Sequence, residues 1–241
     1  MKPHSVRMSL ITLGLLLAAA VVEAATPSIG RVSRITGDQL GSAQLQDGAV
    51  RKLAAGDPVF AGERIRTGAG TVLQIEFTDK SRFTLGPNAE LEVERYLQAS
   101  AGSSEEAFHS RIIKGTFRFV TGLIARKKGE SMRVSIAVAT IGIRGTHVEG
   151  EVIERQEKDG RMVDASAKVA LLEPEGSGTS GAIVVENKFG SVVIDKAGYG
   201  TEIPDEKSPP SPVQRMQLRT IDNLLRALRT PGQTGGPARR Q

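Results

Sequence analysis

Short segments in which apolar and polar residues alternate follow one another along most of the chain. The clearest is 71–78, where Leu73, Ile75 and Phe77 share one face and polar residues share the other. Alternation with a period of two residues is typical of a half-buried β-strand. Segments of the same kind recur between residues 29 and 203, separated by turn signals rich in Gly, Pro and Asp. This pattern predicts an all-β protein.

The arrangement of these strands is left open by the sequence. High glycine content, short strands and close turns favour short stacked strands in either a sandwich or a solenoid. No repeat of fixed length is visible, so the two architectures stand as equal alternatives. The pattern assigns one β domain to residues 25–203.

Beyond residue 203 the alternation stops. Residues 204–212 are rich in proline and are expected to form a linker. In 213–230, apolar residues recur at helical spacing with arginines between them, which predicts one amphipathic helix with Ser211 as N-cap. Residues 231–241 contain mainly Gly, Pro and Arg, and we expect them to be disordered.

The N-terminus has the three parts of a secretory signal peptide. Lys2 and Arg7 supply positive charge, residues 10–20 are apolar or small apart from one threonine, and Ala24 ends a cleavage site. We therefore expect residues 1–24 to be removed and the protein to reach the periplasm. The alternative is an uncleaved anchor, but a spanning helix needs about 20 apolar residues and this run is shorter.

Composition narrows the chemistry. The chain of 241 residues contains no cysteine, which excludes disulfides, cysteine nucleophiles and cysteine-based metal sites. The formal net charge is +5, and arginines are concentrated near the C-terminus. The arginine-rich helix would therefore allow contact with a membrane surface. Nucleic acid is not expected as a partner, because export separates the protein from it and aromatic residues are scarce.

The sequence indicates neither catalysis nor a cofactor. His109 and His147 have no partners at metal-ligand spacing, so we predict no metal site. No Gly-x-Ser-x-Gly motif is present. Glu90, Glu92 and Glu94 alternate on one strand, which favours a solvated face over the paired carboxylates of a glycosidase.

Four motifs resemble the FecR-like domain family. They are Gly56-Asp57 through Thr67-Gly68, the strand pair from Leu73 that includes Asp79 and Ser81, Ala139 to Thr146 with Arg144-Gly145-Thr146 at its end, and Val184 to Gly190 with Ala197 to Thr201. Two departures are Lys80, where family members often have glycine, and His147, where an acidic residue is common. We interpret the motif residues as structural, with Arg144 as an internal strut that binds carbonyls or a carboxylate.

The resemblance implies a periplasmic β-rich sensing or interaction module. The regulator that names the family has a cytoplasmic anti-sigma segment, a membrane helix and a periplasmic domain, and here a signal peptide replaces the first two. The leading hypothesis is a non-enzymatic interaction or scaffold module for envelope or membrane proteins, which binds through sheet edges and loops. The alternative is a signal relay in iron–siderophore uptake that acts through a separate membrane partner. A carbohydrate-active enzyme is the least favoured hypothesis.

Overall fold

The computed structural model describes residues 26–216, except for 38–40, 47, 98–105, 124–131 and 174–180. The predicted signal peptide (1–24) and the predicted disordered tail (231–241) therefore lie outside the described residues. Within them the protein is nearly all β, as the alternation predicts. No helix in the described part of the chain is long and apolar enough to cross a membrane.

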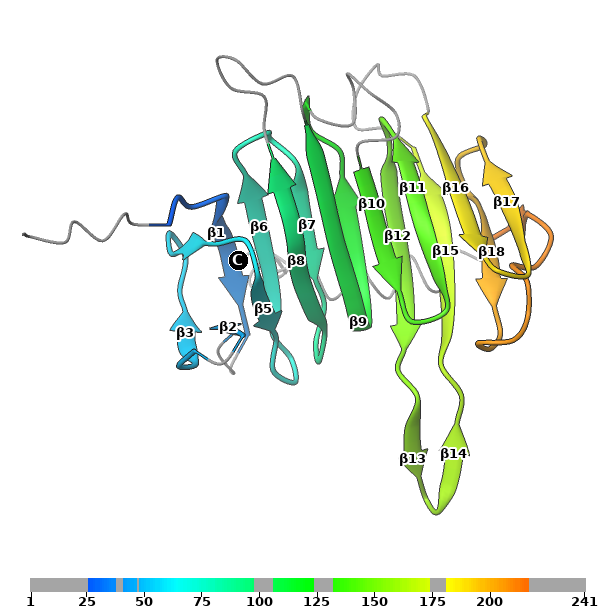
Figure 1. Cartoon of the computed structure of the whole chain (residues 1–241), viewed down its shortest axis with the longest axis horizontal. Coiled ribbons are helices and arrows are strands. Elements are labelled where there is room, and N and C mark those ends of the chain that lie inside the picture. The colour runs from blue at the N-terminus through cyan, green and yellow to red at the C-terminus, as the bar shows by residue number, and fades with distance from the viewer. Residues whose placement is uncertain are drawn as a thin grey trace, which may run out of the picture.

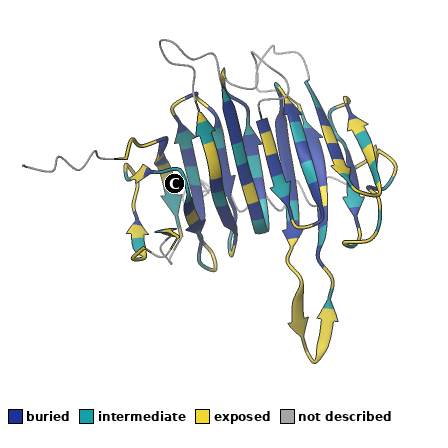
Figure 2. Ribbon diagram, viewed as in Figure 1, coloured by how far each residue is buried: buried dark blue, intermediate teal, exposed yellow. Residues whose placement is uncertain are grey.

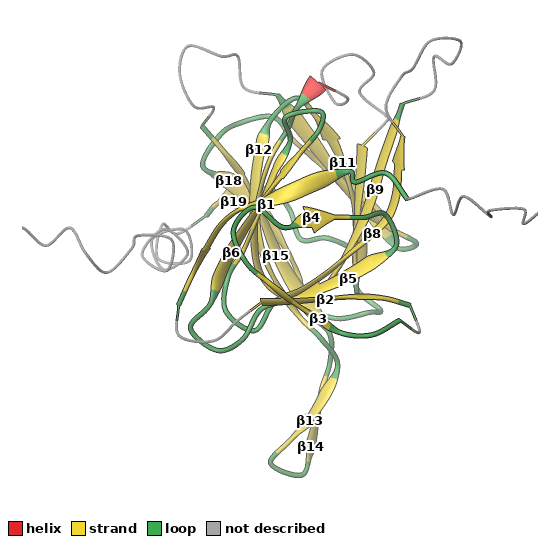
Figure 3. Cartoon of the chain, turned by 90° about the vertical axis from the view of Figure 1, so that its left-hand side faces the viewer, coloured by secondary structure: helices red, strands yellow, loops and turns green. Residues whose placement is uncertain are grey.

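The strands form two layers that pack face to face (Figures 1 and 3). In order across the first layer are β4 (Pro58–Val59), β1 (Gly30–Thr36), β6 (Val72–Phe77), β7 (Arg82–Leu85), β9 (Ala107–Val120), β12 (His147–Ile153), β15 (Ser166–Leu172), β18 (Tyr199–Ile203) and β19 (Gln214–Arg215). In order across the second layer are β3 (Arg51–Leu53), β2 (Gly41–Leu45), β5 (Glu63–Arg66), β8 (Glu90–Leu97), β9 again, β10 (Met132–Ile136), β11 (Ala139–Arg144), β16 (Ala182–Asn187) and β17 (Gly190–Ile194).

Strand β9 belongs to both layers. Its first half pairs with β8 and β10, and its second half, from Gly115 on, pairs with β7 and β12. Gly115 has φ +92°, and a Cβ there would lie 2.4 Å from the Cα of Ala89. Only glycine fits this position, where a conformation disfavoured for other residues coincides with close backbone contact. Ala107–Val120 is thus a single strand that bends at Gly115.

The architecture is a sandwich rather than a solenoid. The chain moves repeatedly from one layer to the other, yet its described strands pair antiparallel except for β9 with β10. The buried apolar residues form one cluster between the layers. Figure 2 shows buried residues in dark blue along the strands of the sandwich. Phe83 and Phe119 pack there with ring centroids 4.3 Å apart, and Phe77 and Phe108 with centroids 4.7 Å apart. Burial of each such ring contributes roughly 1.5–3 kcal/mol.

The end of the described chain differs from the predicted linker and helix. The backbone N–H of Ser211 donates to Glu202 O at 2.9 Å, and Asn187 Nδ2 donates to Ser208 O at 2.8 Å, so residues 204–212 pack on the domain. Gln214 and Arg215 form strand β19 against β18, where the sequence predicted helix from residue 213. The prolines explain this, because they keep the preceding residues extended and so direct the chain into strand pairing. The rest of the predicted helix, 217–230, lies outside the described residues.

A hairpin of β13 (Gln156–Lys158) and β14 (Arg161–Val163) extends beyond the sandwich (Figure 1). Its turn contains Asp159 and Gly160, both with positive φ. The charged residues Lys158 and Asp159 thus lie at the tip of this hairpin.

Candidate functional site

A row of polar and small residues crosses the outer face of the first layer. Arg118 on β9 lies directly opposite Glu149 on β12, and Ala170 and Gly200 continue the row on β15 and β18. These positions point away from the core, because the residues next to them in each strand, such as Phe117, point into it. Strand register alone therefore places a cation beside a carboxylate on this face.

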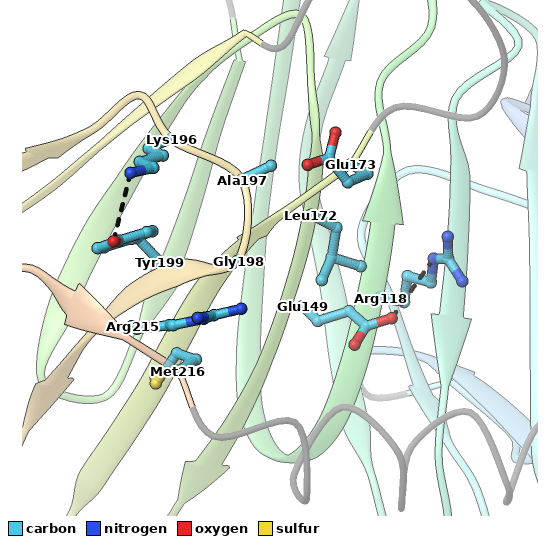
Figure 4. A pocket seen from close by; sticks show the side chains of 10 residues that line it. All are labelled: Arg118, Glu149, Leu172, Glu173, Lys196, Ala197, Gly198, Tyr199, Arg215 and Met216. Atoms are coloured by element: carbon cyan, nitrogen blue, oxygen red, sulfur yellow. Dashed lines mark hydrogen bonds and ion pairs between the residues drawn. The ribbon is translucent and has the colours of Figure 1, made fainter.

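Arg118 and Glu149 of this row line a hollow of about 570 Å³ (Figure 4). The hollow is lined by Arg118, Glu149, Leu172, Glu173, Lys196, Ala197, Gly198, Tyr199, Arg215 and Met216. The loop before β18 and the end of β19 make one wall, and the side chain of Arg215 extends from that wall toward the middle of the hollow. On the same wall, Lys196 Nζ lies 3.3 Å from the hydroxyl of Tyr199.

Glu149 has the most unusual electrostatic environment in the hollow. Its side chain is 1% exposed, and among the described residues its closest cation is Arg118, whose Nε is 3.6 Å from Oε1. Neither carboxylate oxygen accepts a hydrogen bond from the described residues. Burial raises the pKa of Glu149 from 4.5 to about 7, and the positive charge of Arg118 opposes that rise. Buried carboxylates are normally hydrogen-bonded. Both oxygens of Glu149 can therefore still accept hydrogen bonds.

A second hollow, of about 650 Å³, lies on the outer face of the second layer and has the opposite character. Its carboxylates are each paired with a cation, and Glu90 is approached by three: Arg66 at 3.1 Å, Arg64 at 3.5 Å and Lys114 at 4.0 Å. Glu90 is buried, which corrects the prediction that it faces water. The cations on the neighbouring strands β5 and β9 explain its burial. Because its charges are already paired, this hollow offers less to a ligand than the one over Glu149.

Three residues of the FecR-like motifs meet at the segment that follows β9. The N–H and Oγ of Ser81 donate to the carboxylate of Asp79 at 3.0 and 2.7 Å, and the N–H of Gly122 donates to Ser81 Oγ at 3.0 Å. The N–H of Thr121 donates to Thr146 O at 3.2 Å. Asp79 and Ser81 are fully buried. These hydrogen bonds thus join the turn between β6 and β7 to the segment that follows β9.

Thr67 and Gly68 hold a different turn. Thr67 Oγ1 donates to Gly86 O at 2.7 Å and accepts from the N–H of Ala89 at 2.8 Å. Gly68 O accepts from the N–H of Asn88 at 3.2 Å. These three hydrogen bonds fix the turn between β7 and β8, where the chain changes layers.

Gly56 and Asp57 shape the turn before β4. Gly56 has φ +94°, and its N–H donates to Val32 O at 2.8 Å, while the carboxylate of Asp57 accepts from the N–H of Ala54 at 2.7 Å. The turn is thereby held against β1.

Arg144 does not have the interior position suggested by its flanking glycines. It is exposed at the end of β11, while Ile143 before it is buried. The interpretation as an internal strut is therefore wrong, because alternation along the strand directs this side chain outward. Gly145, which follows, has φ +56° and turns the chain toward β12.

Strand β17 presents an apolar edge. It ends the second layer and, among the described strands, pairs only with β16. Val193 on β17 is 59% exposed, its partner Val184 on β16 is 36% exposed, and Phe189 beside the strand is 44% exposed. Unpaired apolar edges are sites where another strand can add.

Arg118 and Glu149 were not identified from the sequence. Each occupies a polar position in an alternating strand, which indicates only that its side chain points away from the core. What sets these two residues apart is that strand register places them side by side, and the sequence does not show which strands are neighbours. No cluster of three or more His, Asp or Glu that could hold a metal ion occurs in the described ranges.

Comparison with known proteins found a matching family model and similar solved structures. The family model described as FecR protein matches residues 63–171. The chain is also similar to two crystal structures of a proposed anti-sigma factor from Parabacteroides distasonis ATCC 8503. The 2.50 Å structure is 13% identical with TM-score 0.47, and the match covers 67% of this chain and 63% of that one. The 1.65 Å structure is 14% identical with TM-score 0.46, covering 67% and 64%.

The chain spans less than two thirds of the length of either solved structure. No curated protein matches it. The motifs at Thr67, at Asp79 and Ser81, and at Arg144 to Thr146 lie inside the matched range, whereas Gly56 and Asp57 precede it. Residues 63–171 thus match the FecR family model, as the motifs predicted.

Proposed function

We propose that this protein is a non-enzymatic interaction module of the periplasm, and that its partner is an envelope protein that adds a strand to β17. The observation that carries the proposal is the apolar edge of β17, which pairs with no strand beyond β16 in the part of the chain that the structure describes. Main-chain hydrogen bonds to such an edge provide affinity, and exposed side chains such as Val193 provide specificity.

The other ends of the two layers are less suited to strand addition. β4 and β19 each have two residues, and β3 has three, of which two are Arg51 and Lys52. Short or cationic edge strands are the usual protection against unwanted pairing. β17 has five residues and no charged side chain. The edge most open to a partner is therefore β17.

Site-specific photo-crosslinking in living cells tests this proposal. A photoreactive residue at Phe189 is expected to capture a partner protein, and the same residue at Val50, which is 60% exposed but far from β17 in sequence, is the matched control. Val193→Lys should abolish the capture without changing the far-UV circular dichroism. Equal capture from both positions, or capture that persists in Val193→Lys, would contradict binding at this edge.

Export is tested separately. If residues 1–24 direct secretion and are removed, mass spectrometry of the periplasmic fraction should find a chain that begins at Ala25. Recovery of the protein in the cytoplasm with residue 1 intact would contradict the proposed location.

The FecR match favours one narrower function, a signal relay in iron–siderophore uptake in which the captured partner is a receptor or a membrane-bound regulator. Deletion of the gene should then abolish siderophore-dependent transcription of receptor genes, and Val193→Lys should have the same effect. Unchanged transcription in the deletion strain would leave the scaffold function and exclude the relay.

A further inference from the structure

We propose that the hollow over Arg118 and Glu149 is the docking site of the chain's own segment 217–230. The sequence predicts that this segment is the main part of an amphipathic helix. The inference is independent of the partner that binds at β17, since the hollow lies on the other layer.

The chain reaches the hollow where this segment begins. The N–H of Met216 donates to Gly198 O at 2.9 Å, and both residues line the hollow. The Met216 side chain lies against Gly200, because a Cβ on that glycine would be 2.6 Å from Met216 Cγ. Residue 217 therefore starts at the wall of the hollow, and no linker is needed for the segment to enter it.

The sheet beside the hollow suits an apolar helix face. Ala170 and Gly200 continue the row of Glu149 on the neighbouring strands and lack long side chains, so a helix backbone can approach the sheet there. Ala170 is 5% exposed although it is not part of the core between the layers. Leu172 and Met216 provide apolar walls. The segment offers a matching stripe of Leu218, Ile221, Leu224, Leu225 and Leu228.

The unsatisfied carboxylate supports the same occupant. Glu149 accepts no hydrogen bond from the described residues, and an arginine side chain is the donor that best fits a carboxylate. Segment 217–230 contains Arg219, Arg226 and Arg229 and one acidic residue, Asp222. At about 100° per residue, Arg219 and Arg226 fall on the face opposite the apolar stripe, and Arg229 lies at its margin. Arg229 is therefore the cation that a docked helix would turn toward the face of Glu149, the only buried carboxylate among the residues that line the hollow.

The length of a helix formed by this segment also matches the distance across the strands of the first layer. A helix of residues 217–230 would be about 21 Å long at 1.5 Å per residue. The four strand spacings from β18 to β7 on the first layer amount to about 19 Å at 4.8 Å each. A helix laid across the strands would therefore extend from the wall at Met216 past Glu149 and Arg118.

Disulfide formation provides a direct test, since the natural chain has no cysteine. We would combine Ala170→Cys with Leu218→Cys, Ile221→Cys or Leu225→Cys, and use Asn223→Cys on the opposite helix face as the matched control. Val193→Cys on the other layer, combined with the same three positions, controls for random collisions. The full-length chain is oxidised mildly and resolved on a non-reducing gel.

The proposal predicts that Ala170→Cys forms intramolecular disulfides with the apolar-face positions. These should form about tenfold faster than those of the Asn223→Cys or Val193→Cys controls, because docking raises the effective concentration of the thiols. Equal rates at all positions would overturn the proposal. Disulfides between molecules only would also overturn it and would assign the hollow to a second copy. A lipid-free chain that forms none of these disulfides but binds anionic lipid vesicles would overturn it as well, and would assign the segment to a membrane surface.

Discussion

Glu149 shows how a single side chain can make the stability of this protein depend on pH. It is 1% exposed, and burial raises its pKa to about 7. Because this pKa is higher in the folded protein than in the unfolded chain, the folded state binds more protons between about pH 4.5 and 7. Stability therefore falls as the pH rises through this range and remains lower above it.

The substitution Glu149→Gln should remove this dependence. At pH 8 we expect the free energy of unfolding to rise by about 1–3 kcal/mol, because the neutral amide avoids the cost of a buried charge. At pH 5 the variant and the natural protein should differ little. Urea titrations at both pH values measure the effect, with Glu151→Gln on the same strand as control. A gain at pH 5 as large as at pH 8 would show that ionisation of Glu149 is not the cause.

Lys80 stands where the family motif often has glycine, and its backbone conformation is one that favours glycine. Its φ is +69°, in the left-handed region that glycine adopts without strain. Lys80→Gly should therefore stabilise the fold by about 0.5–1 kcal/mol, after the larger chain entropy of glycine is considered. The lost contact with Glu76 is exposed and contributes little. Thermal unfolding measures the change, and a lower midpoint would contradict this account.

At the scale of elements, the bend of β9 joins the layers. Gly115→Ala should destabilise the protein by about 3 kcal/mol or more, because the added Cβ would meet the backbone of Ala89 and the residue has positive φ. Gly142→Ala in β11 is the matched control, since its Cβ would have no neighbour closer than 3.9 Å and its φ is not positive. Urea unfolding should separate the two variants clearly. Similar midpoints would show that the bend tolerates a side chain.

The alternation of apolar and polar residues predicted the strands, because it depends only on a local property of each strand, namely that one of its two faces is buried. Gln74 and Phe77 fall on opposite faces whatever their neighbours are. It could not predict that Arg118 lies beside Glu149, since that depends on the pairing of β9 with β12 across residues distant in sequence. The same limit applies to Glu90, which is buried by cations of other strands, and to β19, where pairing with β18 replaced the predicted helix. Tertiary pairing, not local preference, decided these positions.

At the scale of the whole molecule, the two layers share one core. The buried residues form a single cluster that runs from Ile29 near the N-terminus to Ile203 in β18. β9 is hydrogen-bonded in both layers, so neither layer can separate without breaking that strand. A continuous core and a shared strand are conditions for cooperative unfolding.

The two tyrosines of the chain allow this cooperativity to be measured, because there is no tryptophan. Tyr96 stacks on Phe77 in the N-terminal half, and Tyr199 lies in β18 near the other end. In Tyr199→Phe, fluorescence reports only Tyr96, and in Tyr96→Phe it reports only Tyr199. Within each variant, the urea midpoints from fluorescence and from far-UV circular dichroism should coincide. The Tyr96→Phe variant should be less stable than the natural protein, because the Tyr96 hydroxyl accepts a hydrogen bond from the N–H of Asp79 at 2.8 Å. Midpoints that differ between probes in either variant would show that the ends of the sandwich unfold separately, despite the strand that they share.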